Sequence, residues 1–258
     1  MASAPPAYDN ELLQVHLELA AARLPGPDYY TVLRWIHQIL KPQTYVEIGV
    51  RQGESLRAAL AKTRCIAVDP LPALTGDFPP DTRVFPMTSD RFFESQDLRK
   101  LLAAPTFSLA FIDGLHLFEQ ALMDFVHLEP FAGRRSIILL HDCLPLDRVT
   151  SERVRTTHFY SGDVWKLPMC LMKHAKKLRM ATIRTAPTGL CLVSNFDPAS
   201  RALNGPSTDY LNEYLALGFA DYQRNADGMP PTFANSFEAV SACIAYLLDG
   251  SVRGGPEP

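Results

Sequence analysis

The sequence predicts an α/β protein in which helices cover both faces of a mostly parallel β-sheet. Two patterns lead to this fold class. Short apolar segments alternate with amphipathic segments over much of the 258 residues, and two further apolar segments then flank a Pro-Thr-Gly turn. The first pattern indicates parallel strands joined by helices, and the second indicates an antiparallel hairpin. With 47% hydrophobic residues, the chain is long enough to bury one large core.

The expected elements follow one another in a regular order. Residues Tyr29–Leu40 form a helix, because Val32, Ile36 and Leu40 recur at helical spacing. The parallel strands are expected at residues 45–50, 65–68, 83–86, 107–112 and 136–140. Helices are expected at 54–61, 117–128 and 164–174, and the hairpin strands at 178–185 and 190–194.

Three parts make up the predicted domain organisation. An N-terminal arm covers residues 1–28, the α/β domain covers 29–204, and a helical extension covers 205–258. The extension is expected to hold helices at 209–219 and 235–249. Asn235 would be the N-cap of the second helix, with Glu238 three residues later as in a capping box. Whether the extension covers a site or joins subunits stays open.

Composition excludes several classes of partner. The net charge is only −3, so we expect no nucleic-acid binding. The five cysteines are scattered and form no Cys-x-x-Cys pair, which argues against a zinc site and a disulfide framework. No apolar run has the length of a membrane span or the form of a signal peptide. We therefore expect a soluble, cytoplasmic protein with no membrane partner.

A glycine turn after the first strand is the first candidate binding site. Glu47 lies within the strand, Gly49 and Gly53 bracket the turn, and Ser55 follows. The Gly-x-x-x-Gly spacing differs from the dinucleotide fingerprint Gly-x-Gly-x-x-Gly. It suits a ligand without phosphates, such as S-adenosylmethionine (SAM), whose carboxylate could meet backbone N–H groups and Ser55 while Glu47 attracts its ammonium. The alternative is a tight structural turn.

Two later positions extend this candidate cofactor site. Asp69 ends the second strand, where a carboxylate can accept both hydroxyls of a ribose; the alternative is a turn cap before Pro70. Ser89 follows the third strand, and its position predicts contact with the adenine ring. Ser89 or Asp90 could equally be the N-cap of the next helix.

Acid and imidazole groups follow the fourth and fifth strands. Asp113 and His116 come after one strand, and His141 and Asp142 after the other. Carboxyl ends of parallel strands share one edge of a sheet, so these side chains should converge on one crevice. His116 is the candidate general base, with Asp113 orienting it or holding a metal. The alternatives are that His116 caps the next helix and that His141 fixes a loop.

Together these motifs resemble a known family. Glu47-x-Gly-x-x-x-Gly, Asp113-Gly-x-His116, His141-Asp142 and the Gly-Asp-Val-Trp-Lys segment at 162–166 are similar to class I SAM-dependent methyltransferases, in particular the family of the macrocin- and mycinamicin-type sugar O-methyltransferases. The resemblance covers roughly residues 40–195. It implies a Rossmann-like, seven-stranded sheet that ends in the hairpin.

The resemblance also implies a divalent cation, usually Mg²⁺. Asp113 and Asp142 would be its ligands, with His141 at a position that is commonly acidic in the relatives. Imidazole departs from the oxygen ligands that Mg²⁺ prefers, and Cys143 is a second departure. Mn²⁺, another softer ion or a metal-free site stay open as alternatives.

The function predicted from these motifs is SAM-dependent methylation of a hydroxyl on a small-molecule acceptor, a sugar or a secondary metabolite. The alternatives are a metal-dependent hydroxylase or an N-methyltransferase on the same fold, and a non-enzymatic SAM-binding scaffold. Asp163 is expected to open the helix before the hairpin, and Trp165 and Lys166 to line an acceptor pocket or a subunit contact. A homo-oligomer stays open, because related enzymes often form dimers.

Overall fold

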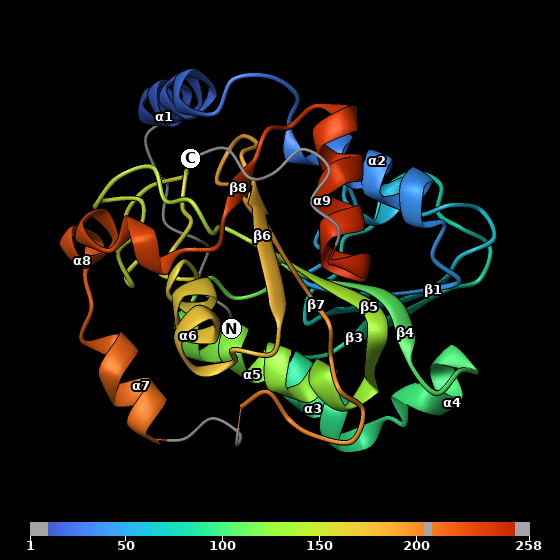
Figure 1. The fold of residues 1–258 in the computed structure, drawn as a ribbon. Helices are drawn as coiled ribbons and strands as arrows, with labels where there is room; N and C mark the ends of the chain where they lie inside the picture. The colour runs from blue at the N-terminus through green and yellow to red at the C-terminus, as the bar shows by residue number, and fades with distance from the viewer. Residues whose placement is uncertain (1–9, 204–207, 251–258) are drawn as a thin grey trace.

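The computed structural model describes residues 10–203 and 208–250, and an eight-stranded sheet runs through its centre (Figure 1). The strand order is β3-β2-β1-β4-β5-β7-β6-β8. The strands are β1 (Thr44–Ile48), β2 (Arg64–Asp69), β3 (Thr82–Pro86), β4 (Phe107–Ile112), β5 (Ala132–His141), β6 (Arg179–Ile183), β7 (Leu190–Ser194) and β8 (Thr232–Phe233). Strands β1 to β5 are parallel, and β7 is antiparallel to both neighbours. The predicted fold class is confirmed, with one short strand more than the expected seven.

Helices cover both faces of this sheet. One face carries α3 (Ser89–Ser95), α4 (Leu98–Leu102), α5 (Phe118–Leu128), α6 (Lys166–His174) and α7 (Thr208–Leu215), and the other carries α2 (Tyr29–Leu40) and α9 (Phe237–Asp249). Alternate strand residues feed the two cores: Val46 and Ile48 pack in one cluster, and Tyr45 packs in the other. This alternation explains why the central strands are apolar throughout.

Local signals set the ends of α2 as the sequence suggests. The Asp28 carboxylate accepts a hydrogen bond from the Thr31 N–H at 2.9 Å, which caps the first turn. Lys41 adopts a left-handed conformation just before Pro42, which stops the helix. The predicted bounds of this helix are confirmed.

The helix expected at 54–61 is wrong. Only a single 3₁₀ turn forms there, η1 (Leu56–Ala58). The Ser55 hydroxyl, which could have capped a helix, donates instead to the Glu47 carboxylate. Ala59 is already extended, so the chain leaves the turn without a second helical repeat.

Residues after 207 belong partly to the sheet. The single helix expected at 209–219 divides into α7 and α8 (Phe219–Arg224), and the 3₁₀ turn η3 (Ala226–Gly228) follows α8. Another 3₁₀ turn, η2 (Glu129–Phe131), lies between α5 and β5. Strand β8 pairs with β6, and α9 packs against α2 and β6. The extension is therefore not purely helical.

The predicted N-cap of α9 is also wrong by one residue. Ser236 accepts from the Ala239 N–H at 3.2 Å, whereas the Asn235 amide donates to the carbonyls of Pro25 and Pro27. Asn235 thus ties the extension to the segment that precedes α2, which a local capping rule does not reveal.

The predicted N-terminal arm contains one helix, α1 (Asn10–Arg23). Residues 1–9 of the arm lie outside the described residues. The same holds for residue 204 at the end of the predicted α/β domain and for residues 205–207 and 251–258 of the extension. Among the helices of the described part, none has the length and apolar character needed to cross a membrane.

Candidate active site

A cavity of about 870 Å³ opens where β1, β2, β4 and β5 end. Most of the predicted site residues line it: Gly49, Ser55, Asp69, Ser89, Asp113, His116, His141 and Asp142. Glu47 and Gly53 do not line it. Ligand pockets usually measure about 300–1,000 Å³, so this cavity is large enough for two molecules in contact.

Gly49 brings two strand ends together. Its φ is +87°, and a Cβ placed on it would lie 2.0 Å from the Asp113 carbonyl oxygen. No other residue type fits that approach. The close contact that the glycine permits is therefore with the chain itself, and it holds Asp113 next to the glycine turn.

Glu47 lies behind the cavity wall. Its side chain is fully buried, and the Ser55 hydroxyl donates to it. Burial raises the pKa of the Glu47 carboxyl to about 8, although the Ser55 hydrogen bond acts in the opposite direction. The Ser55 hydroxyl is thereby committed to Glu47, and the two residues support the turn from inside.

The Asp69 carboxylate accepts hydrogen bonds from backbone N–H groups of the glycine turn, which were predicted to bind the cofactor. Its Oδ2 accepts from the backbone N–H of Val50 at 3.0 Å and of Arg51 at 2.8 Å, and its Oδ1 accepts from Leu71 N–H at 2.7 Å. The turn-cap alternative is thus present. Because Asp69 also lines the cavity, the cap holds a carboxylate at the position where a ribose would lie.

Ser89 belongs to a polar cluster in the wall of the cavity. The Gln120 amide donates to Ser89 Oγ at 3.3 Å, to Asp90 Oδ1 at 3.2 Å and to Asp124 Oδ1 at 3.2 Å. Thr88 is the N-cap of α3, so neither alternative cap, Ser89 or Asp90, is used. Burial raises the pKa of Asp124 to about 6. Gln120 and Asp124 were not predicted as site residues, because they lie inside a helix pattern with no motif to distinguish them.

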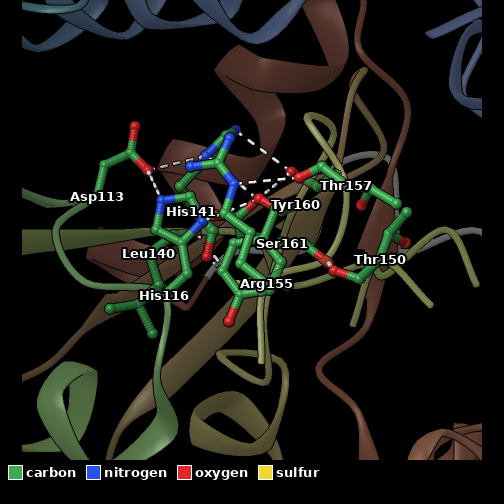
Figure 2. Close-up of polar contacts among 12 residues, drawn as sticks. Asp113, His116, Leu140, His141, Thr150, Arg155, Thr157, Tyr160 and Ser161 are labelled. Atoms are coloured by element: carbon green, nitrogen blue, oxygen red, sulfur yellow. Dashed lines mark hydrogen bonds and ion pairs between the residues drawn. The ribbon is translucent and has the colours of Figure 1, made fainter. Parts of the chain in front are cut away.

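Two histidine–aspartate pairs form the centre of the site. His116 Nδ1 lies 3.0 Å from Asp142 Oδ2. His141 Nδ1 lies 3.1 Å from Asp113 Oδ1, and both of these residues are labelled in Figure 2. Each pair joins the end of β4 to the end of β5. The Thr188 hydroxyl donates to Asp142 Oδ1 at 2.6 Å, and Asp142 itself has a left-handed φ of +59°. The predicted convergence of these four residues is present in the structure.

Electrostatics favour the charged forms of this cluster. Burial disfavours a cationic His116, but the carboxylates of Asp142 and Asp113 outweigh it and raise the His116 pKa to about 9. The same balance raises the His141 pKa to about 10. Burial also opposes ionisation of Asp142, but the two imidazoliums hold its pKa far below the ordinary value. At neutral pH His116 and His141 are therefore both imidazoliums beside the Asp142 carboxylate.

The candidate metal ligands come together. Asp113, His141 and Asp142 each offer a donor atom, and these atoms lie within 4.8 Å of one another. The donor set does not fit Mg²⁺, because one donor is imidazole and the carboxylate oxygens already pair with imidazoliums and Thr188. A softer ion would have to displace the proton of His141.

A long loop between β5 and α6 closes one side of the cavity. Asp163 Oδ1 accepts from the Phe118 N–H at 2.7 Å and so caps α5, while its Oδ2 pairs with Arg153 and Lys166 at 2.8 Å each. Asp163 was predicted to open α6, and this prediction is wrong, because α6 begins after Trp165. The alternative role of His116 as the cap of α5 is also not present. A Cβ on Gly162 would lie 1.8 Å from the His116 carbonyl oxygen, so the loop packs directly on the backbone of His116.

Trp165 and Lys166 do not line the main cavity. Both are buried and lie at a second cavity of about 200 Å³, beside Arg148 and Phe219. Lys166 serves as the counter-ion of Asp163. The expected acceptor-pocket role of these two residues is therefore not supported by their position.

Several cavity residues had no signal in the sequence. The Tyr29 ring packs against His141 with centroids 4.2 Å apart, from the first residue of α2. Arg155 and Tyr160 come from the long loop, and Thr188 from the hairpin turn. Tyr160 stacks parallel to His116 with centroids 5.8 Å apart. Only the three-dimensional path of these segments brings them to the strand ends.

Comparisons with known proteins found similarity to one family model and to solved structures. Residues 46–143 match a family model described as a methyltransferase domain. No curated protein matches the chain. Similar solved structures include a Streptomyces achromogenes O-methyltransferase of tomaymycin synthesis in complex with SAM (13% identity, 73% of this chain, 91% of that chain, TM-score 0.48). A Bacillus cereus O-methyltransferase in complex with S-adenosylhomocysteine (SAH) is another (14% identity, 74% and 92%, TM-score 0.48).

A third is the SAH-bound methyltransferase of Podospora anserina (13% identity, 76% and 100%, TM-score 0.46). These identities are too low for the role of any residue to be transferred. The matched segment 46–143 runs from β1 to the residue after Asp142, so it contains the strand ends that build the cavity.

Proposed function

We propose that this protein is a SAM-dependent methyltransferase that methylates a hydroxyl oxygen of a small molecule, with a sugar or a secondary metabolite as the acceptor class. One observation carries the proposal. The pair His116–Asp142 lies in the same cavity as the turn at Gly49 and the carboxylate of Asp69. A candidate base and a candidate cofactor site thus share one cavity.

Charge at the cofactor end supports SAM, which carries a positive sulfonium. Glu54, Asp69, Asp90 and Asp124 line that end, and Arg51 is the cation among them. A surplus of carboxylate favours a cationic ligand. Asp124 is a buried carboxylate in a wall of this cavity, and such a group gains most from a ligand N–H donor.

His116 supplies the proton acceptor. Its Nδ1 faces Asp142 Oδ2 and the Tyr160 carbonyl, each at 3.0 Å, whereas its Nε2 lies 3.7 Å from Asp113 Oδ1, beyond hydrogen-bond distance, so Nε2 is the nitrogen that takes the proton. Transfer forms the bond between the acceptor oxygen and the methyl carbon and breaks the bond from that carbon to sulfur. The hydroxyl proton passes to Nε2, and SAH leaves.

His116 must lose its resting proton before it can act. The sulfonium of bound SAM places a second positive charge in the cavity, and a like charge lowers the pKa of an imidazolium. Cofactor binding therefore prepares the base. No step in this mechanism passes through a metal, because the donor set does not fit Mg²⁺.

Calorimetry with ligand-free protein tests the proposal, followed by transfer of a radiolabelled methyl group from SAM to a panel of hydroxylated acceptors. We expect SAH to bind with a Kd below about 1 mM, within the usual range for a substrate site. Absence of both SAM and SAH binding would overturn the proposal. Binding without transfer to any acceptor would favour the scaffold alternative.

A further inference from the structure

The turn between β6 and β7 places one hydroxyl against the histidine–aspartate pairs. Thr188 lies in this turn, lines the cavity and is 1% exposed. Its hydroxyl donates to Asp142 Oδ1 at 2.6 Å, and the same oxygen lies 3.5 Å from His141 Nε2. The other oxygen of Asp142, Oδ2, faces His116 Nδ1 at 3.0 Å. One carboxylate thus contacts the threonine hydroxyl and the candidate base through different oxygens.

Backbone contacts hold Thr188 close to the end of β5. The Leu144 N–H donates to the Thr188 carbonyl at 2.7 Å, two residues after Asp142. The Gly189 N–H donates to the Thr185 carbonyl at 2.8 Å. The peptide group that follows Thr188 is therefore anchored at both its carbonyl and its N–H, and the hydroxyl approaches Asp142 from a fixed position.

The start of α2 supports the same turn from another part of the chain. The Thr185 hydroxyl donates to the Pro27 carbonyl at 2.8 Å, and the Tyr29 N–H donates to the Ala186 carbonyl at 2.9 Å. The Tyr29 ring packs against His141 with centroids 4.2 Å apart. The hairpin turn and the start of α2 therefore form one support behind the residues that follow β5.

The hydroxyl removes a freedom that the Asp142 carboxylate would otherwise have. A carboxylate rotates about its last torsion angle in a broad energy well, and such a rotation would move Oδ2 away from His116. A hydrogen bond to Oδ1 opposes this rotation. Because His116 Nδ1 is anchored on Oδ2, holding the carboxylate also holds the imidazole ring. A misplacement of about 1 Å in an active site can reduce the rate about 100-fold.

We propose that Thr188 is a positioning residue for the methyl transfer: its hydroxyl fixes the Asp142 carboxylate, which in turn orients the ring of His116. This inference rests on the proposed function and adds a residue that contacts neither the reacting atoms nor the glycine turn. The geometry requires the hydroxyl and not only the shape of the side chain, because the contact with Asp142 is a hydrogen bond.

NMR of the full-length protein labelled with ¹⁵N-histidine tests the contact without an acceptor. We expect a slowly exchanging imidazole N–H signal from His116 Nδ1, identified by its absence in His116→Gln. Thr188→Val keeps the shape of the side chain but removes the hydroxyl. In this variant the exchange of the Nδ1 proton with water should become about tenfold faster, the effect of one hydrogen bond to a charged group. Thr188→Ser, which keeps the hydroxyl, should restore slow exchange.

Thr182→Val is the matched control. Thr182 lies in β6 and is also 1% exposed, but its hydroxyl has no hydrogen-bond partner among the described residues. This variant should leave the His116 signal unchanged. Thr188→Ala removes the same hydroxyl and takes the place of the valine variant if that variant is not folded at the measuring temperature. Slow exchange in both hydroxyl-free variants, the same change in Thr182→Val, or no such signal in the wild-type protein would overturn the inference.

Methyl transfer measures the consequence for the reaction. With an acceptor from the hydroxylated panel, Thr188→Val should lower kcat about tenfold or more while the KM for SAM and the Kd for SAH stay unchanged, and Thr188→Ser should recover most of the loss. An unchanged kcat in Thr188→Val would overturn the inference. If the wild-type protein neither binds SAH nor transfers a methyl group, it is the proposed function that fails, and the NMR experiment still decides whether Thr188 positions the pair.

Discussion

His116 Nδ1 lies 3.0 Å from Asp142 Oδ2, and this contact joins the loop after β4 to the end of β5. The Asp142 side chain is only 5% exposed and that of His116 is 28% exposed, so the pair is poorly screened by water. The carboxylate stabilises the imidazolium that forms when His116 accepts a proton. The same contact orients the ring: Nδ1 is anchored, while Nε2 lies 3.7 Å from Asp113 Oδ1, beyond hydrogen-bond distance.

Replacing His116 by alanine should reduce kcat by about 10²–10⁴-fold, the usual contribution of a general base. SAH affinity should stay unchanged, because the cofactor turn is built from other residues. Radiolabelled methyl transfer and calorimetry measure the two quantities. Activity that survives the substitution would contradict the base role and would favour an amine acceptor, which needs no base once it is unprotonated.

The pH profile should reveal the base directly. The His116 pKa is raised to about 9, and the base works only when neutral, so kcat/KM for SAM should rise with pH, reach half its maximum near pH 9 and level off about one pH unit higher. At saturating SAM the same limb, measured on the acceptor, should move to lower pH because of the sulfonium charge.

Asp142→Asn provides the check on this assignment. Loss of the carboxylate removes a stabilising charge from the imidazolium, so the rising limb should move to lower pH even where kcat falls. Asp97→Asn, at an exposed helix cap far from the cavity, should leave the profile in place. A limb that does not respond to Asp142→Asn would mean that another group titrates.

Metal removal should leave activity unchanged. Asp113 and Asp142 offer carboxylate oxygens, but these already pair with imidazoliums and Thr188, and the third donor, His141, is an imidazole, which Mg²⁺ does not prefer. Dialysis against EDTA followed by a methyl-transfer assay measures this. Loss of activity that Mn²⁺ restores and Mg²⁺ does not would instead place a softer ion among these three residues.

Asp163→Asn should destabilise the protein by about 3–5 kcal/mol, because it leaves the buried ammonium of Lys166 without its counter-ion. Urea unfolding measures the change. Glu152→Gln removes an exposed carboxylate 3.9 Å from Arg148 and should change the free energy of unfolding by less than about 0.5 kcal/mol. In the double variant Asp163→Asn with Lys166→Met, much of the loss should be recovered, which separates the unpaired Lys166 charge from the lost ion pair with Arg153.

Gly49→Ala should disrupt both stability and cofactor binding. The new Cβ would meet the Asp113 carbonyl in a backbone conformation that alanine disfavours, so we expect a loss of more than about 1 kcal/mol. SAH affinity should fall with it. Gly218→Ala, where the nearest atom lies 4.0 Å from the added Cβ, is the control and should cost less than about 0.5 kcal/mol. Similar effects of both substitutions would contradict the close-approach role of Gly49.

Local patterns predicted some elements well and others poorly. The bounds of α2, β4 and β7 were predicted correctly, because each has a strong apolar pattern and clear breakers. The helix at 54–61 failed because Ser55 bonds to Glu47 in the preceding strand. Asn235 failed as a cap for a related reason, since its amide reaches carbonyls near the N-terminus.

The sequence by itself determined the fold class and the meeting of Asp113, His116, His141 and Asp142, because the carboxyl ends of parallel strands share one edge. Only the tertiary structure decided which histidine pairs with which aspartate, that Asp163 caps a distant helix, and that the Tyr160 ring stacks on His116. Spacing rules describe neighbours within one element. The contacts that build this site depend on how a long loop and separate strands pack against one another.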